Sequence, residues 1–546
     1  MKAIICLNAI RFSGGYFMSF AIGKSIPRKE AWKKVTGEAK YTDDFPAQDT
    51  LFARLVTSSH AHAKIVDIDI SDAISRDGVK AVLVGKDFPE QFGALILHRP
   101  ALARDVVRYF GEPVALVVAT DEAKAEAAAR LIKVKYQLLP VVLTPSEAVA
   151  EGAPIIHNPP QPYKTEAEDV FPEAGTNIAA SFRIRKGDAK AALSSCKKIV
   201  ERKYYLPPSD HVAMEVRSAR AEISADGTVT ITTSSQAPYA VRKQLADAFS
   251  IPSGMINIKV PFVGGAFGGK VTQLLEPLAY IASKSVGGKA VRVILTREQD
   301  VAAAPCRMGL EATVKIGADE SGIIRAMEVT YLVDCGAYSD ISPYMAKAAA
   351  VDCTGPYSIE NVHCDALCVY TNHTFATSYR GFSHDSTAFC IERTMDILAK
   401  ECEIDPLEFR LKNAIRPGSL SPTRVLCTES IVGNLPECIN KVKEISEWGG
   451  KNELKKGVVN AKGIACFWKS ENPPTDAISG AMITFNPDGS VNLNTGVVEI
   501  GCGAQTNLTQ MLAERLKLDI SKVHAVMPVD TFTAPEHWKT VASLTE

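Results

Sequence analysis

One glycine-rich segment could bring main-chain N–H groups close to an anionic or polar ligand. It reads Lys259-Val-Pro-Phe-Val-Gly-Gly-Ala-Phe-Gly-Gly-Lys270, with four glycines around one phenylalanine. Glycine lets the backbone approach a ligand closely, and the N-terminus of the helix expected after the loop would add positive partial charge. The segment therefore predicts an oxyanion or polar-cofactor site, with a merely tight turn as the structural alternative.

The same segment also matches the GxxxxGK spacing of a nucleotide-binding P-loop, from Gly264 to Lys270. Val271 follows, where a P-loop needs serine or threonine to hold magnesium. No strand-end aspartate in the context of a Walker B motif is evident either. These departures weigh against a nucleotide hydrolase.

Composition gives no reason to expect a nucleic acid or a membrane as the partner. The 546 residues carry 61 Lys and Arg against 62 Asp and Glu, a formal net charge of -1. No apolar run reaches the ~18–20 residues of a membrane-spanning helix. A small or uncharged ligand fits this balance better, and the length predicts three or four domains of roughly 150 residues.

The 13 cysteines indicate reduced thiols in a cytoplasmic protein rather than a disulfide framework. Their number is odd, their spacing is wide and no CxxC occurs, so the usual iron–sulfur and zinc-ribbon spacings are unavailable. Cys364 and Cys368 lie in an alternating stretch and should face the core from one strand. His60 and His62 form a closely spaced pair and are a minor candidate for a metal site.

Hydrophobic periodicity predicts mixed strands and helices that would place the glycine loop between a strand and a helix. The expected strands are 51–57, 80–84, 113–119, 132–136, 199–205, 217–223, 228–233, 256–263, 462–468, 481–486 and 491–500. The expected helices are 121–131 with Asp121 as its cap, 239–249, 271–285, 387–402, 407–413 and 504–516. A strand pair, a glycine-rich turn and a helix therefore occur twice, around Gly264 and around Gly501.

The glycine loop resembles the GGGFGGK loop of the molybdenum hydroxylases, the large subunits of xanthine dehydrogenases and aldehyde oxidoreductases. Other segments fall in the family's order from about residue 20 to the end of the sequence. They are Ile26-Pro-Arg-Lys29, 35–44, His211-Val-Ala-Met-Glu215, Thr233-Ser-Ser-Gln236, Asp334-Cys-Gly-Ala-Tyr338, Thr371-Asn372, Tyr379-Arg-Gly-Phe382, 405–413, Glu499-Ile-Gly-Cys-Gly503, Asp530-Thr531 and Thr540-Val-Ala-Ser543. The chain is identified as a member of that family.

The resemblance implies an α+β fold of three domains. An N-terminal α/β hammerhead-like domain over residues 18–150 would be followed by a linker over 151–180. Two mixed α+β molybdopterin-binding domains would follow, the first over 181–418 and the second, incomplete, over 419–546. Residues 1–17 are expected to be a non-native or disordered extension, because Met18 opens a segment that reads cleanly as a start.

The resemblance also implies a molybdopterin cofactor, commonly the cytosine dinucleotide form, whose metal has no protein ligand because the pterin dithiolene holds it. Gln236 would donate to the apical oxo group, Arg380 would contact the pterin, and Phe382 would form a wall of the substrate funnel. Their structural alternatives are bonds within the strands, an ion pair and a core position. The implied cofactor-binding residues are Gln236, Gly265, Ala266, Phe267, Gly268, Gly269, Arg380, Gly501, Cys502, Gly503, Thr540 and Ser543.

By this resemblance, the enzyme would insert water-derived oxygen at an electron-poor carbon of an aldehyde or N-heterocycle. Electrons would pass to 2Fe-2S and FAD groups on partner subunits. The family's general base is a glutamate near the C-terminus, and Glu546 does not occupy that motif. A partner, possibly a second molybdopterin-binding chain, would then supply the base; the alternative is a truncated, non-catalytic member that acts only in assembly.

Departures from the family pattern bear on the substrate. Val271 and Ala348 stand where the xanthine enzymes carry a substrate-facing glutamate and arginine, so purine specificity is not expected. Cys502 replaces a glutamine, and Lys539 replaces a glycine. The cysteine of the carbon monoxide dehydrogenase branch is absent from 379–382.

Overall fold

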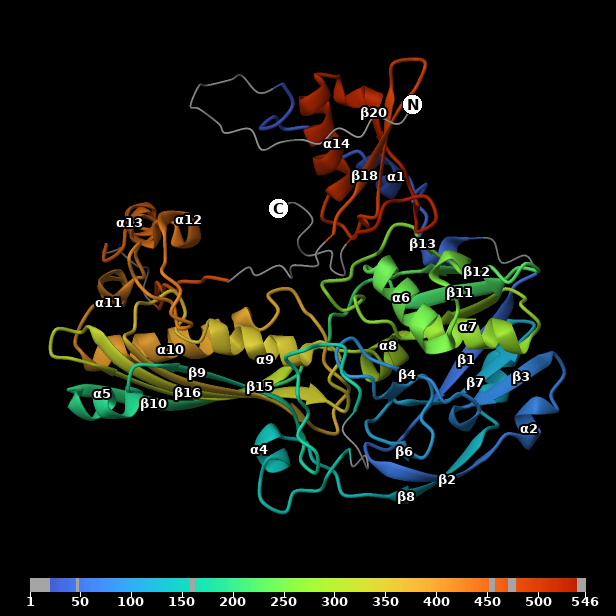
Figure 1. The fold of residues 1–546 in the computed structure, drawn as a ribbon, viewed down its shortest axis with the longest axis horizontal. Helices are drawn as coiled ribbons and strands as arrows, with labels where there is room; N and C mark the ends of the chain where they lie inside the picture. Colours follow the sequence, from blue (N-terminus) through green and yellow to red (C-terminus); the bar gives the residue numbers. More distant parts are fainter. Residues whose placement is uncertain (1–19, 46–48, 158–162, 451–456, 470–477, 538–546) are drawn as a thin grey trace.

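The structure is a computed structural model that describes residues 20–45, 49–157, 163–450, 457–469 and 478–537. The expected extension over residues 1–17 lies outside the described residues, as do Lys539, Thr540 and Ser543. The described part confirms a mixed α+β chain built on two large sheets and a smaller C-terminal sheet (Figure 1).

The larger sheet has eight strands and is shared by the N-terminal part and the glycine-loop region. Its order is β21-β13-β12-β11-β14-β1-β7-β3. The bounds are β1 (Leu51–Thr57), β3 (Val79–Val84), β7 (Pro113–Ala119), β11 (Ser218–Ile223), β12 (Val229–Thr233), β13 (Ile256–Val260), β14 (Val291–Ile294) and β21 (Val529–Asp530). Because β1 pairs with β14 in parallel, one continuous sheet crosses the domain boundary predicted near residue 150.

Helices cover one face of this sheet. They are α6 (Pro238–Phe249) and α7 (Leu275–Ser285), and α7 packs along β11 with Leu278 and Ile281 fully buried. On the N-terminal side, α3 (Glu122–Ala129) begins as predicted, since the Asp121 carboxylate accepts the Lys124 N–H at 2.9 Å. The strand β7, which lies between β1 and the edge strand β3, is buried at every position, which explains its continuous apolar run.

The second large sheet has the order β10-β15-β16-β17-β9. Its strands are β9 (Ile178–Lys186), β10 (Lys198–Leu206), β15 (Gly309–Ala318), β16 (Ile324–Gly336) and β17 (Asn361–Tyr370). The helices α9 (Ser342–Val351) and α10 (His384–Glu401) lie on one face and α5 (Ala189–Ser195) on the other (Figure 1). Cys364 and Cys368 are fully buried on β17, which confirms their predicted core position.

Shorter elements complete the described chain. The strands are β2 (Ala63–Asp69), β4 (Gln91–Phe92), β5 (Arg99–Pro100), β6 (Val106–Val107) and β8 (Lys133–Leu138). The helices are α2 (Ser71–Ile74), α4 (Pro145–Ala148), α8 (Arg297–Ala303), α11 (Pro406–Asn413), α12 (Glu429–Val432) and α13 (Leu435–Ile445). Within the described ranges, every helix is too short or too polar to cross a membrane, and every cysteine is free.

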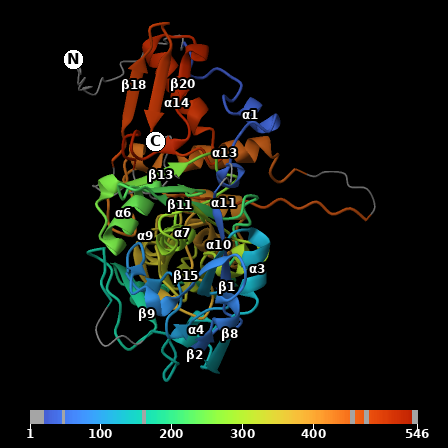
Figure 2. The same cartoon turned by 90° about the vertical axis from the view of Figure 1, so that its right-hand side faces the viewer.

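The C-terminal sheet has the order β18-β19-β20 and packs on one long helix. Its elements are β18 (Ala481–Phe485), β19 (Val491–Thr495), β20 (Val523–Ala525) and α14 (Ala504–Leu516). The N-terminal segment with α1 (Ala31–Val35) lies beside α14 (Figure 2). The Lys29 N–H donates to Thr506 at 2.8 Å and Gln510 donates to the Ala21 carbonyl at 2.7 Å, so the segment before residue 36 contacts the C-terminal part.

Three predicted elements differ from the structure, and the first is the strand 491–500, which ends at Thr495. The helix after the glycine loop begins at Leu275 and not at Val271, because the chain makes further turns that include the Val271 N–H to Gly268 carbonyl bond. Residues 462–468 form no strand, and the Cys466 N–H instead donates to the Glu392 carboxylate at 3.0 Å. That main-chain donor is therefore used by a side chain rather than by a sheet.

Candidate functional site

Two buried basic side chains, those of Lys270 and Arg217, anchor the glycine loop between β13 and α7. Lys270 Nζ lies 2.8 Å from Glu215 Oε2, and the Gly264 N–H donates to the same oxygen at 2.7 Å. Burial lowers the pKa of Lys270, and the Glu215 carboxylate opposes that shift. Arg217 donates to the Gly269 carbonyl at 2.6 Å. Lys270 therefore holds the loop and is not placed as a phosphate ligand.

The loop backbone requires glycine where it passes close to other segments. Gly265 and Gly268 have φ values of +101° and +100°, a region that favours glycine. A Cβ at Gly268 would lie 2.6 Å from the Ser378 carbonyl oxygen, and one at Gly269 would lie 2.7 Å from the His211 ring. Phe267 also has a positive φ, +54°, and its ring is 42% exposed. The loop thus presents its backbone and one aromatic ring at the surface.

Gln236 is held against this loop from the segment between β12 and α6. Its side chain is buried, and Oε1 accepts the Gly268 N–H at 3.1 Å. Its own N–H donates to the Lys270 carbonyl at 3.0 Å. Among the described residues, none accepts a hydrogen bond from its amide nitrogen. The structure therefore brings Gln236 and Gly268 together and leaves the amide donors of Gln236 unused by the described chain.

A third segment, residues 378–382, reaches the loop from the end of the five-stranded sheet. The Arg380 N–H donates to the Phe267 carbonyl at 2.8 Å. The Arg380 side chain is exposed, and no described acidic side chain forms an ion pair with it. Phe382 has a φ of +62° and packs partly buried against the core of that sheet. Arg380 thus meets the glycine loop through its backbone, while Phe382 also has core contacts.

The side chains of His211 and Arg307, from two other segments, contact Tyr379 within this segment. The His211 ring stacks on Tyr379 at 4.3 Å with 17° between the planes, and the Arg307 guanidinium lies 4.2 Å from the same ring. His211 Nε2 lies 2.7 Å from the Ser378 carbonyl. Burial lowers the pKa of His211 to about 4, so the ring is neutral at pH 7. His211 belongs to a motif noted above, whereas Arg307 was missed because it follows no recognisable pattern.

The second glycine-rich turn is organised around a buried carboxylate. Glu499 Oε1 accepts the N–H groups of Gly501 at 2.8 Å and Gly503 at 3.1 Å, and Oε2 accepts the Gln505 N–H at 3.3 Å. Arg28 donates to the Gly501 carbonyl at 2.9 Å. The N–H groups of Gly501 and Gly503, two of the implied cofactor-binding residues, therefore bind Glu499 within the chain.

A main-chain hydrogen bond connects the starts of the two glycine turns. The Val263 N–H donates to the Glu499 carbonyl at 3.1 Å. Cys502 is exposed at the tip of the second turn, and a Cβ at Gly501 would meet no atom within 4 Å. The four sequence-distant segments thus form one surface with exposed backbone, an exposed arginine and a buried amide. Such a surface suits a flat, polar, anionic group.

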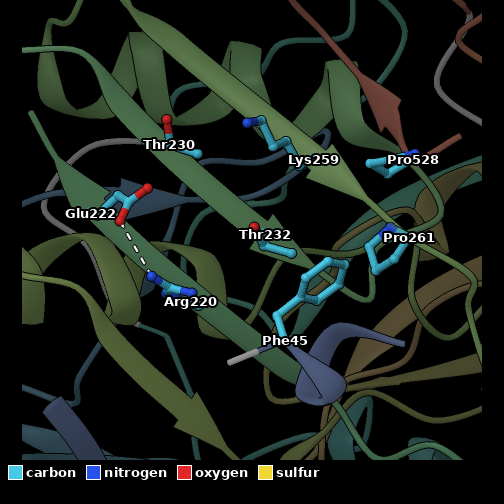
Figure 3. A pocket seen from close by; sticks show the side chains of 8 residues that line it. All are labelled: Phe45, Arg220, Glu222, Thr230, Thr232, Lys259, Pro261 and Pro528. Carbon is cyan, nitrogen blue, oxygen red and sulfur yellow. Dashed lines mark hydrogen bonds and ion pairs between the residues drawn. The ribbon is translucent and has the colours of Figure 1, made fainter. Parts of the chain in front are cut away.

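Other candidate sites are separate from this surface. A cavity of about 270 Å³ lies on the eight-stranded sheet and is lined by Phe45, Arg220, Glu222, Thr230, Thr232, Lys259, Pro261 and Pro528 (Figure 3). Lys259 and Pro261 lie at the start of the segment that leads into the first glycine turn, but no residue of 264–269 or 499–503 lines this cavity. In the described part of the chain, no group of three or more His, Cys, Asp or Glu side chains could hold a metal ion. His60 and His62 are therefore not part of such a group.

Comparisons with known families match the same regions. The aldehyde oxidase and xanthine dehydrogenase a/b hammerhead domain matches residues 36–140. Models of molybdopterin cofactor-binding domains match residues 170–414 and 441–546. The two glycine turns fall within these two cofactor-binding matches.

Similar proteins agree with these matches. A putative xanthine dehydrogenase molybdenum-binding subunit of Escherichia coli is 32% identical over 93% of this chain and 68% of its own length. The nicotinate dehydrogenase large molybdopterin subunit of Eubacterium barkeri is 30% identical over 78% of this chain and 96% of its own length. The structure of the aldehyde oxidoreductase from Desulfovibrio gigas aligns with a TM-score of 0.78 and 26% identity, over 93% of this chain and 56% of that one.

Proposed function

Because the chain belongs to the molybdenum hydroxylase family of xanthine dehydrogenases and aldehyde oxidoreductases, we propose that it is the molybdopterin-binding subunit of a hydroxylase for an aldehyde or an N-heterocycle. The observation that carries this proposal is the meeting of Gln236, the Gly268 turn and the Arg380 segment. Three separate stretches of sequence converge there on one exposed backbone surface.

The residues of that surface fit the cofactor that the family implies. A Cβ at Gly268 or Gly269 would overlap Ser378 or His211, so glycine lets the loop take this shape, and the exposed Arg380 guanidinium offers several donors in one plane. When bound, molybdopterin would supply the redox centre at which an electron-poor carbon is oxidised. The dinucleotide form, with cytosine, stays a prediction.

Each residue of the surface has a proposed task. Gln236 would donate from its amide nitrogen to the cofactor, because its oxygen already accepts the Gly268 N–H. Arg380 would bind the polar edge of the pterin. Phe382 would orient a planar substrate with its ring. Cys502, at the exposed tip of the second turn, would contact the cofactor where Gly501 and Gly503 shape the backbone.

Neither Glu215 nor Glu499, the two glutamates that hold the loops, is available as the general base. Glu215 holds Lys270 and the Gly264 N–H, and Glu499 accepts three main-chain N–H groups. A general base must instead reach the proton that it removes. We therefore infer that a partner polypeptide supplies this glutamate. The alignment with this chain covers 96% of the Eubacterium relative, whose name calls it a molybdopterin subunit. That match is compatible with a cofactor site divided between two chains.

The electrons need carriers, which we assign to partner subunits with 2Fe-2S and FAD groups in the same cytoplasmic complex. The 546 residues contain no CxxC that would suggest an iron–sulfur segment. Val271 and Ala348 are apolar, so they offer a purine neither a carboxylate nor a guanidinium. An aldehyde or a smaller N-heterocycle is therefore the proposed substrate class.

The proposal is tested by turnover of the native complex purified through this chain. Aldehydes, nicotinate-like heterocycles and purines would be offered with an artificial electron acceptor in water enriched in ¹⁸O. Oxidation of an aldehyde or heterocycle with ¹⁸O in the product supports the proposal. No turnover by a complex that contains molybdopterin would favour the non-catalytic assembly role.

A further inference from the structure

The turn of residues 379–382 carries both Arg380 and Phe382, and part of its backbone is strained. Gly381 has a φ of +105° and Phe382 has a φ of +62°. Glycine adopts such angles freely, whereas a bulky side chain rarely does. A strained residue persists only where the surrounding structure holds its backbone, and such residues gather at functional sites. The groups that hold this turn therefore determine how Phe382 is presented.

The buried side chain of His384, the first residue of α10, contacts this turn. The main-chain N–H of His384 donates to the Gly381 carbonyl at 3.1 Å, and its ring Nδ1 lies 3.1 Å from the same oxygen. Its Nε2 lies 2.6 Å from Oδ2 of Asp352, the residue that ends α9. The two side chains are only 4% and 5% exposed. A buried histidine–aspartate pair thus connects the Gly381 carbonyl to the end of α9.

Both polar neighbours of the His384 ring are hydrogen-bond acceptors. A carbonyl oxygen faces Nδ1 and a carboxylate faces Nε2, so the ring donates to both only when it carries two protons. A buried carboxylate is costly unless it is paired, and the doubly protonated ring provides a partner for Asp352. Because the ring and Asp352 hold each other, Nδ1 stays directed at the Gly381 carbonyl.

Asp352 also connects this pair to α9. Its main-chain N–H donates to the Ala348 carbonyl at 3.1 Å, one helical turn earlier. By the resemblance described above, Ala348 stands at a substrate-facing position and Phe382 forms a wall of the substrate funnel. The helices α9 and α10 lie side by side on the five-stranded sheet (Figure 1). One buried pair therefore joins two elements that the proposed function places beside the substrate.

The Arg380 half of the turn has a separate support. The Arg307 guanidinium donates to the Arg380 carbonyl at 3.2 Å and forms an ion pair with Asp385. These contacts do not include the His384 ring. Loss of the ring should therefore release the Phe382 half of the turn while Arg380 keeps its own support.

We propose that His384 and Asp352 are positioning residues that hold Phe382 in place for a planar substrate. The inference rests on the proposed function, in which the Phe382 ring orients the substrate. Both residues act through the Gly381 carbonyl. Neither lies in the segments that carry the family resemblance, so nothing in the family pattern marks the pair.

Two variants of the native complex separate the hydrogen bonds of the pair from its bulk. His384→Phe with Asp352→Leu removes the polar atoms of both side chains and leaves no buried charge unpaired, so the chain should still fold. Asp352→Asn is the conservative variant, because a neutral His384 ring can accept from the asparagine amide and still donate from Nδ1 to Gly381. His98→Gln is the matched control, since it removes another buried histidine whose ring contacts lie elsewhere.

Steady-state kinetics with nicotinate and benzaldehyde as planar probes and acetaldehyde as the small probe measures the effect. The double variant should raise KM for the planar probes about fivefold, because a misplaced ring no longer stacks on them. Its kcat, its molybdopterin content and its KM for acetaldehyde should change less than about twofold. Hydrogen exchange over residues 378–387 should become about fivefold faster in the double variant. Asp352→Asn and His98→Gln should resemble the wild type in all of these measurements.

Three results would overturn the inference. One is wild-type KM values and wild-type exchange over residues 378–387 in the double variant, which would make the pair a core contact only. Another is the same change in His98→Gln, which would reflect general destabilisation. The third is loss of molybdopterin from the double variant, which would assign the pair to cofactor retention. Exchange is measured without turnover, so failure of the positioning pair is distinguishable from failure of the proposed function, which the wild-type turnover reports.

Discussion

The Gln236 side chain uses its carbonyl oxygen and its amide nitrogen for different purposes. Its oxygen is fixed by the Gly268 N–H, which sets the direction of the amide plane. A glutamine that merely joined neighbouring strands would use both ends within the sheet. Gln236 does not do so within the described residues, and this favours a role toward the cofactor.

Two substitutions separate these ends. Gln236→Glu keeps an oxygen for Gly268 and removes the amide donors, whereas Gln236→Ala removes both. We expect either change to lower kcat about a hundredfold, because a preorganised donor in a dry site contributes roughly 3 kcal/mol. Steady-state kinetics on the assembled complex measures the effect, with molybdenum content as the control. Wild-type turnover in Gln236→Glu would remove the donor role.

At the scale of elements, the glycine turn between β13 and α7 determines the shape of the site. Gly268 combines a φ of +100° with the close approach of the Ser378 carbonyl, so strain and overlap both oppose a side chain there. By contrast, a Cβ at Gly254 would meet no atom within 4 Å.

Gly268→Ala should therefore destabilise the chain by about 2–4 kcal/mol and reduce its cofactor content. Gly254→Ala should change the free energy of unfolding by less than about 1 kcal/mol. Chemical unfolding and pterin analysis of both variants test this expectation. Equal stability of the two variants would show that the turn does not require glycine at 268.

Local patterns predicted those elements whose signal lies in their own residues. The strand Pro113–Ala119 and the helix Ala504–Leu516 have the predicted bounds, since a continuous apolar run and an apolar helical face are visible without neighbours. The predicted start of the helix α7 was wrong because the further turns after Lys270 depend on packing against other segments. β15 was not predicted, although its buried residues alternate along the strand.

The candidate site shows the same difference between features visible in local sequence and features that depend on packing. The family motifs marked Gln236, Gly268 and Arg380, and the structure brings their segments together. No pattern indicated that Arg307 would cover Tyr379, because that contact exists only after two distant segments meet. Nor could the sequence show that Glu499 would accept the N–H groups of its own turn.

At the scale of the whole molecule, a buried group of aromatic and polar rings joins the N-terminal part to the five-stranded sheet. His98 contacts the rings of His157, Tyr338 and Tyr370. Its Nδ1 lies 2.9 Å from the Ile96 carbonyl, and its Nε2 accepts the Ser339 N–H at 3.3 Å, which specifies a neutral ring. Burial lowers the pKa of His98 to about 3.

Stability should consequently fall as the pH drops below about 6.5, the ordinary pKa of histidine in the unfolded chain. In that window the unfolded state binds a proton at His98 and the folded state does not, until the pH approaches 3. Each such histidine lowers the free energy of unfolding by up to about 1.4 kcal/mol per pH unit.

Urea unfolding between pH 6.5 and pH 5 measures that slope. His98→Gln should make it shallower, and substitution of the exposed His524 should leave it unchanged. An identical slope in His98→Gln and the wild type would mean that His98 does not titrate differently on folding.

If these segments form part of a molybdopterin site, the native complex purified through this chain should contain the cofactor. Mass spectrometry would determine its molybdenum, its pterin dinucleotide and every co-purifying polypeptide. We expect about one molybdenum and one molybdopterin per copy of this chain, together with a second chain that completes the site. A complex without molybdenum and without such a chain would contradict it.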